Sequence, residues 1–273
     1  MKRWLSVLFA LGSFLGVIVV SIFAFLSLKL DLLNVSSAPA SAQSITASTT
    51  VVAGSIGDAE LFFRQKGIIL STNPATPLSW ANWDTLSVDD PNAGQAAKDL
   101  KTEWAKYSDE VVKHSGLKAI YLVRNLSVSG QARSGMPDPN ATNALYFDVS
   151  DIYMQSEGGD YLRRTYHHEF SHFIEYKLTG SYAPNDVAWD GCNAIGTTYG
   201  KGGSSMYNDP DFAHKAHPSY GFIDGYATSG VEEDKAEVFA YYMTNNTYLR
   251  NLAEKDAGIA CKLTQTEKLI LSL

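Results

Sequence analysis

Two histidines of this sequence, His168 and His172, stand four residues apart, with Glu169 between them. On a helix, residues separated by four positions lie on one face, so both imidazoles can bind the same metal ion. Histidine nitrogens in this arrangement commonly bind Zn²⁺. Glu169 is poorly placed to bind that ion, but it can reach a water molecule beside it and act as a general base. The pattern therefore predicts a hydrolytic zinc site that holds one ion per chain.

Histidine pairs at this spacing also occur on helices that bind no metal, and the spacing alone leaves that interpretation open. The intervening glutamate favours the metal site, because a chance match at all three positions is rare in a chain with 6 histidines. His167 is rotated by about 100° from His168 on a helix, so we expect it at the rim of the site and not as a ligand. His214 and His217 lie in a loop with proline and aspartate, and we expect them at the surface or beside a substrate.

A catalytic zinc site needs a third protein ligand and keeps one position open for water. At the short spacings that many zinc peptidases use, no histidine or glutamate follows the pair that could complete the site. Residues 231–240 read as a helix with clustered carboxylates, of which Glu233 and Glu237 share one face. Asp190 is a rival ligand, and the cluster could also be a solvated helix face. The residue types alone leave these alternatives open.

Two segments resemble a known family, the anthrax lethal factor-like zinc metallopeptidases of the gluzincin type, which include secreted Pro-Pro endopeptidases. The first segment is the HEFSH run at residues 168–172. In that family, a tyrosine precedes the ligand glutamate by seven residues, and an Ala-Glu-x-Phe element begins three residues after it. Tyr226, Glu233 and residues 236–239 stand at these offsets. Ser171 departs from the family, in which glycine is common at that position.

The resemblance implies a role for each of the matched residues. Glu233 would be the third zinc ligand, and Glu169 the general base. Tyr226 would assist the oxyanion, and Glu237 would be a carboxylate that supports the ligands without binding zinc. The resemblance further implies that the strand before the metal helix, near residues 144–149, is the sheet edge along which an extended peptide pairs.

The elements that must position these residues indicate an α+β fold. We expect a small antiparallel sheet, a metal-binding helix and a C-terminal helical lobe, preceded by one N-terminal apolar helix. Periodicity and turn residues predict helices at 92–113, 161–178, 231–245 and 264–273, strands at 117–123 and 144–149, a loop or irregular hairpin at 127–143 and a long irregular segment at 181–225.

The N-terminus predicts export. Lys2 and Arg3 precede 25 residues without charge, 4–28, which is long enough to span a bilayer as a helix. Residues 40–42 (Ala-Ser-Ala) could be a signal-peptidase site, so the segment is either a retained anchor or is cleaved near Ala42. The predicted division is 1–33 for the anchor or signal, 34–53 for a flexible tether, and 54–273 for the peptidase domain, with lobes of about 54–157 and 158–273.

Composition narrows the class of protein. The net charge of −7 disfavours a nucleic-acid partner. Cys192 and Cys261 could pair in an oxidising compartment, although two unrelated thiols are an equal alternative. We therefore expect an extracytoplasmic zinc endopeptidase that acts on peptides or proteins and contacts the membrane if its anchor is retained. A hydrolase of a non-peptide or cell-wall amide, and a surface binding module with structural zinc, are the alternatives.

Overall fold

The computed structural model describes residues 56–273. The predicted N-terminal apolar helix, the tether and the boundaries between them lie outside these residues. Within the described part of the chain, no helix is both long enough and apolar enough to cross a membrane. The described residues belong to one compact unit.

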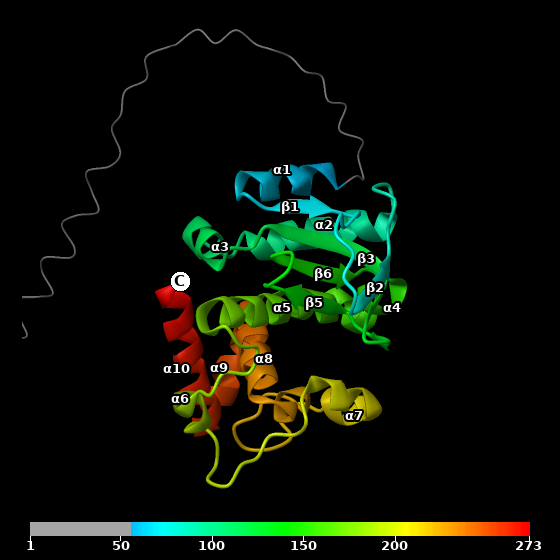
Figure 1. Ribbon diagram of the computed structural model, residues 1–273. Coiled ribbons are helices and arrows are strands. Elements are labelled where there is room, and N and C mark those ends of the chain that lie inside the picture. The colour runs from blue at the N-terminus through cyan, green and yellow to red at the C-terminus, as the bar shows by residue number, and fades with distance from the viewer. Residues whose placement is uncertain (1–55) are drawn as a thin grey trace, which may run out of the picture. The chain divides into compact units, whose positions relative to one another are not determined.

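Helices and strands alternate in the first half of this unit, and helices dominate the second half (Figure 1). The first half contains α1 Gly57–Gln65, β1 Ile69–Ser71, β2 Ala81–Asp84, α2 Pro91–Trp104, α3 Asp109–Ser115, β3 Ala119–Val128, β4 Gln131–Ala132, β5 Gly135–Asp138, β6 Ala144–Asp148 and α4 Asp151–Met154. The second half contains α5 Asp160–Thr179, α6 Val187–Asp190, the 3-10 turn η2 Gly203–Asn208, α7 Pro210–Ala213, the 3-10 turn η3 Tyr226–Ser229, α8 Val231–Thr244, α9 Asn246–Ala253 and α10 Ala257–Ser272. A further 3-10 turn, η1 Ser156–Gly159, precedes α5.

The predicted combination of a small sheet with C-terminal helices is confirmed, but the strand directions differ from the prediction. The strand order is β1-β3-β6-β5, and β3 runs parallel to both β1 and β6. Only β2, β4 and β5 pair antiparallel with their neighbours. The chain leaves β3, forms β4 and β5, and then returns as β6 in the direction of β3, which makes this pair parallel.

This topology corrects the expected substrate edge. All residues of β6 are buried, and the strand lies between β3 and β5. The edge strand next to β6 is β5, which belongs to the segment 127–143 that we predicted as a loop or irregular hairpin. Pro137 and Gly135 disfavour a strand in sequence, but both are tolerated at an edge, where one side of the backbone needs no partner.

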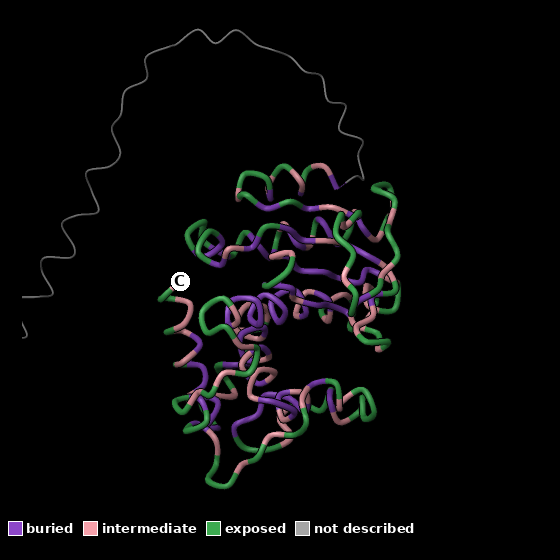
Figure 2. Tube along the Cα trace, viewed as in Figure 1, coloured by how far each residue is buried: buried purple, intermediate pink, exposed green. Residues whose placement is uncertain are grey.

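The helix predicted to bind the metal, α5, extends from Asp160 to Thr179, close to its predicted bounds, and ends at Gly180 in the left-handed conformation (φ 76°). Figure 1 shows α5 beneath β5 and β6, with α8 on its other side. Every residue from Thr165 to Glu175 is buried, as Figure 2 shows for this part of the trace. The helix is therefore held rigidly between the sheet and the C-terminal helices.

The predicted helix 92–113 is two helices in the structure. Trp104 ends α2, and Ser108 begins α3 by accepting a hydrogen bond from the N–H of Val111 (3.2 Å). Trp104 and Tyr107 nevertheless both face the main core, as the 3.6-residue period indicated, because the short break keeps them on one side. That core also contains Phe170 of α5 and Phe239 of α8.

The C-terminal helices form a second core around Trp189, Phe222 and Val238. Sequence periodicity missed α9, and it placed the start of the last helix at 264 instead of Ala257. The side chain of Asp256 caps that helix by accepting hydrogen bonds from the N–H groups of Gly258 (2.7 Å) and Ile259 (3.1 Å).

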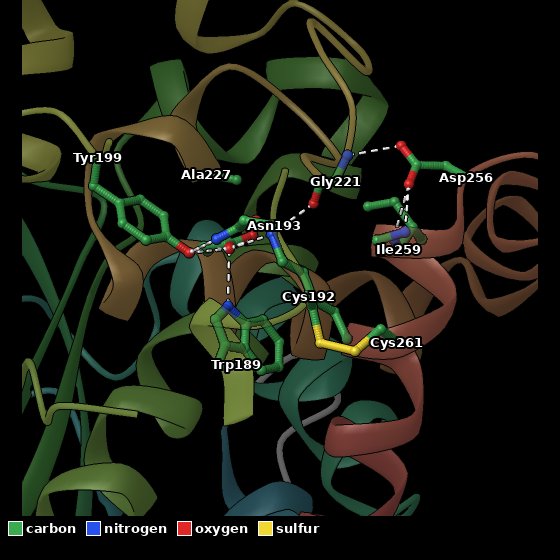
Figure 3. Close-up of polar contacts among 12 residues, drawn as sticks. Trp189, Cys192, Asn193, Tyr199, Gly221, Ala227, Asp256, Ile259 and Cys261 are labelled. Carbon is green, nitrogen blue, oxygen red and sulfur yellow. Dashed lines mark hydrogen bonds and ion pairs between the residues drawn. A yellow bond between two sulfur atoms is a disulfide. The ribbon is translucent and has the colours of Figure 1, made fainter. Parts of the chain in front are cut away.

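A disulfide (Figure 3) and a hydrogen bond from a buried lysine attach the irregular segment 181–225 to these helices. Cys192 and Cys261 are bonded, with their Cα atoms 5.5 Å apart. Beside them, the fully buried Lys262 donates to Asp234 Oδ2 (2.5 Å) and to the carbonyl of Gly221 (2.6 Å). The segment has little regular structure, as expected, yet it is fixed at these points.

Candidate metal centre

Helix α5 places both histidines of the pair in one buried position. The Nε2 atoms of His168 and His172 are 3.0 Å apart, and the two residues are only 7% and 8% exposed. Two neutral imidazoles facing each other at this distance need a proton or a metal ion between them, because two nitrogen lone pairs repel. The four-residue spacing thus produces the geometry that the sequence predicted for this pair.

Helix α8 brings Glu233 to the same point. Its Oε2 atom lies 3.0 Å from His168 Nε2 and 3.1 Å from His172 Nε2. Burial would raise the pKa of Glu233, but the neighbouring imidazoles outweigh this effect and hold the pKa well below its ordinary value. Among the described residues, these three form the group of His, Cys, Asp or Glu side chains that could hold a metal ion.

The donor set fits zinc. Two histidine nitrogens and one carboxylate oxygen converge from two helices, which is a set that catalytic zinc sites use. The rival ligand Asp190 is exposed at the end of α6 and lies outside this group. The fit to zinc therefore rests on three side chains that meet at one point, although Glu233 lies 65 positions after His168 and 61 after His172.

Glu169 faces the cleft next to this centre and is 9% exposed. Burial raises the pKa of its carboxyl group, and the charges of His168 and His172 oppose this shift. Gly135 of the edge strand lies directly against it. A Cβ atom on Gly135 would approach Glu169 Cγ to 2.6 Å and Thr165 Cγ2 to 2.8 Å, so only glycine lets the strand come this close.

Tyr226, on the turn η3, lies beside His168. Its ring centroid is 5.8 Å from that of His168, and burial raises the pKa of its hydroxyl well above the ordinary value. Gly203 of η2 covers both Tyr226 and Glu233. A Cβ atom at Gly203 would clash with Tyr226 Oη and with Glu233 Oε1, and would lie 2.8 Å from Tyr226 Cζ. The loop around η2 is thus in direct contact with the centre.

Two further carboxyl groups lie behind His168. Glu237 Oε1 is 2.8 Å from His168 Nδ1, the nitrogen that faces away from Glu233. Asp224 is hydrogen-bonded to Glu237, and burial together with the Glu237 charge raises the pKa of Asp224 well above its usual value. Asp224 Oδ1 also accepts a hydrogen bond from the N–H of Ala227 (2.9 Å), which fixes the turn that carries Tyr226.

Asp224 was missed in the sequence. The only sign of Asp224 in the sequence is that an acidic residue stands within the largely apolar stretch Phe-Ile-Asp-Gly-Tyr at 222–226. Burial of a carboxyl group without a polar partner costs free energy. Such a residue is often paired with another polar group. The partner, Glu237, lies 13 positions further along the chain, so the pair could not be recognised without the fold.

The expected rim position of His167 is wrong. His167 is fully buried on the core side of α5, with Nε2 2.6 Å from Glu103 Oε2 and Nδ1 2.5 Å from Tyr107 Oη. Burial lowers the pKa of His167, and the Glu103 carboxylate opposes this shift. The rotation of about 100° was large enough to direct this ring away from the cleft altogether. With both ring nitrogens engaged, His167 fixes the rotation of α5 about its own axis.

The two loop histidines differ from each other. His214 is exposed and lines the cleft, with its ring 6.1 Å from that of Tyr161, which agrees with a place beside a substrate. His217 is turned away and lies with Nε2 3.0 Å from Asp256 Oδ2. Neither residue belongs to the group that could hold a metal.

A cleft of about 770 Å³ contains the centre. Helix α5 forms its floor and β5 one wall, and the segment 206–214 with η3 forms the opposite wall. Its aromatic lining consists of Trp80, Tyr161, Tyr176, Tyr182, Tyr207 and Tyr226. The predicted irregular segment 181–225 thus supplies a large part of the surface that a substrate would meet.

Neither a family model nor a curated protein matches this sequence. Among solved structures, the chain is similar to a candidate zinc-binding metallo-peptidase from Bacteroides caccae. The two share 17% sequence identity, the match covers 79% of this chain and 82% of that chain, and the TM-score is 0.48. At this level of likeness, the function of the present chain has to be inferred from the side chains of its own site.

Proposed function

We propose that this chain is a zinc-dependent endopeptidase of the lethal factor-like type that acts outside the cytoplasm. The observation that carries the proposal is the convergence of His168, His172 and Glu233 beside Glu169 in an open cleft. A structural zinc site would close its coordination with four protein donors, whereas the described residues bring three together here. The disulfide supports an oxidising compartment, which fits either an N-terminal anchor or cleavage near Ala42.

His168, His172 and Glu233 would hold the zinc ion. When bound, zinc supplies a Lewis acid that polarises a carbonyl group and makes a nearby water molecule more acidic. Glu237 would fix the ring of His168 through Nδ1, as carboxylates commonly do for metal-binding histidines. Asp224, through its hydrogen bond to Glu237, would in turn hold that carboxylate in place.

Glu169 would move the proton in the reaction. Its carboxylate accepts a proton from the attacking water and then delivers it to the nitrogen of the leaving amine. Burial favours this role, because a carboxylate with a raised pKa is a better base. The Tyr226 hydroxyl would donate a hydrogen bond to the oxyanion that develops on the peptide carbonyl, a contribution of typically about 3–4 kcal/mol.

The edge of β5 would bind the peptide as an additional strand. The N–H of Asp148 donates to Ser134 O (2.9 Å), so alternation along the ladder directs the N–H and C=O of Gly135 away from β6 and toward the cleft. At Pro137 there is no N–H, and its C=O accepts from Tyr182 Oη (3.3 Å). An extended backbone could therefore pair at Gly135, directly beside Glu169.

The decisive experiment incubates the full chain with a mixed peptide library, with and without a chelator, and then restores zinc. We expect cleavage that the chelator abolishes and zinc recovers. Glu169→Gln should abolish hydrolysis and leave zinc content at about one ion per chain, because this residue is not a ligand. Glu110→Gln is the matched control, since it removes an exposed carboxylate from α3, outside the cleft.

Full activity of Glu169→Gln would refute the proposed base. Absence of bound zinc in the unaltered protein would refute the metal site. Zinc binding without cleavage of any peptide would favour a hydrolase of another amide or a binding module, and mass spectrometry of cell-wall fragments incubated with the protein would separate these two.

A further inference from the structure

Two arginines line the cleft, and Arg133 differs from the other because its guanidinium group is in no ion pair within the part of the chain that the structure describes. It lies between β4 and β5 and lines the cleft. Among the described residues, no carboxylate lies within ion-pair distance of its guanidinium group. The other arginine of the cleft, Arg164, is paired with Glu157 (2.7 Å). Arg133 is therefore free to bind an anion.

The guanidinium group is nevertheless held in place. Its Nη2 donates to Gln131 Oε1 (2.7 Å) and its Nη1 to the carbonyl of Ala132 (3.2 Å). The guanidinium carbon lies over the ring of Tyr207, 4.4 Å from the ring centroid. Gln131 in turn donates to the carbonyl of Ser204 (3.2 Å), so the two walls of the cleft meet at this point.

These contacts orient Arg133 for a carboxylate. A guanidinium group can bind a carboxylate through two parallel hydrogen bonds, and a guanidinium held over an aromatic ring can make them with its remaining N–H groups. Because the group is already oriented, less conformational entropy is lost when a ligand binds. The chain as a whole is acidic, with a net charge of −7, so an unpaired cation in the cleft is an exception that favours an anionic ligand.

The position of Arg133 indicates which part of a peptide it would meet. Arg133 precedes Gly135 by two residues, and Gly135 contacts Glu169. Antiparallel pairing is the more stable arrangement per residue, and it directs the C-terminal part of a bound peptide toward the start of β5. At about 3.4 Å per residue, the offset corresponds to about two residues beyond the bond that the water beside Glu169 would attack.

We propose that Arg133 binds a carboxylate of the substrate within two residues on the C-terminal side of the scissile bond. The inference rests on the proposed peptidase function and adds its substrate preference. The carboxylate could belong to an Asp or Glu side chain or to the C-terminus of the peptide, and both present the same group to the guanidinium.

The test measures kcat and KM on quenched fluorescent peptides derived from a cleaved library sequence. One set carries Glu, Gln or Lys at the first or second position after the scissile bond, with an amidated C-terminus. A second set ends two residues after that bond, either as the free acid or as the amide. The proteins are the full chain, Arg133→Gln, Arg133→Glu and the control Lys215→Gln, which removes an exposed positive charge that does not line the cleft.

The unaltered protein should prefer Glu over Gln, or the free acid over the amide, by about tenfold or more in kcat/KM. The set that shows the preference identifies the source of the carboxylate. Arg133→Gln should lose the preference but cleave the Gln peptide within about threefold of the unaltered rate, since no charged contact is removed there. Arg133→Glu should favour Lys, and Lys215→Gln should retain the original preference.

Equal cleavage of the Glu and Gln peptides and of the acid and amide would overturn the inference while leaving the peptidase function intact. A preference confined to the N-terminal side of the scissile bond would also overturn it. If Arg133→Gln slowed all peptides equally and shifted the pH–rate profile, Arg133 would act through the charge of Glu169 and not on substrate. Failure of the unaltered protein to cleave any peptide would instead reject the underlying function.

Discussion

Removal of the disulfide should destabilise the protein strongly. Cys192 and Cys261 are 69 positions apart, and for a loop of this length the chain-entropy relation gives about 4 kcal/mol of stabilisation at 25 °C. For a domain of about 200 residues, each kcal/mol changes the melting temperature by about 2–4 °C. The double variant Cys192→Ser with Cys261→Ser should therefore melt about 10 °C or more below the unaltered protein.

The measurement is thermal unfolding of the full chain followed by circular dichroism. The unaltered protein under reducing conditions should melt close to the double variant, while the double variant should not respond to reductant. Zinc affinity should also fall in the double variant, because Glu233 lies inside the loop that the disulfide closes. A decrease of less than about 3 °C in melting temperature would refute the reasoning, since it would mean that the buried contacts of Lys262 fix the segment without the disulfide.

Two further changes probe other contacts. Gly203→Ala should displace Tyr226 or Glu233 and lower kcat by about tenfold or more, with the melting temperature nearly unchanged. The neighbouring Ser204→Ala is the control. Equal values of kcat in the two variants would contradict the close approach of Gly203 to the centre. Burial alone would raise the pKa of the Asp256 carboxyl group, but hydrogen bonds from the N–H groups of Gly221 and Ile259 outweigh burial and lower this pKa. The stabilisation that the carboxylate provides is therefore present above about pH 4, and it is lost as the pH falls through the folded-state pKa. Asp256→Asn should therefore lower the free energy of unfolding at pH 7 by about 1–3 kcal/mol, and the difference should shrink in chemical denaturation at pH 3; a constant difference would contradict the assignment.

The residues of the candidate metal centre were easier to predict from the sequence than the residues around it. A spacing of four residues determines that two side chains share a helix face, whatever the rest of the fold does. The helix around His168 was therefore predicted almost to its bounds. Glu233 lies 61 positions beyond His172, and residue types alone left it among several carboxylates. Only the resemblance to a known family singled it out, and the structure brings its carboxylate to the histidine pair.

The rest required contacts between segments far apart in the chain. Strand β5 has a weak local preference for a strand, and it forms because its backbone pairs with β6 and its Gly135 fits against Glu169. His167 lies in the core because Glu103 and Tyr107, about 60 positions earlier, provide its partners. Periodicity reports which face of a helix is apolar, but it does not report which polar side chains find partners inside.

Pro137 has a consequence for how the protein behaves in a crowded solution. The exposed margin of a sheet can pair with the same margin of a second molecule, and such contacts begin aggregation. At β5 this margin is four residues long and lacks a donor at one of the two positions that face outward. The proposed pairing of one substrate strand needs only Gly135, whereas a long intermolecular ladder cannot continue past the proline. The same residue that shortens the proposed peptide-binding edge thus helps to keep the molecules apart.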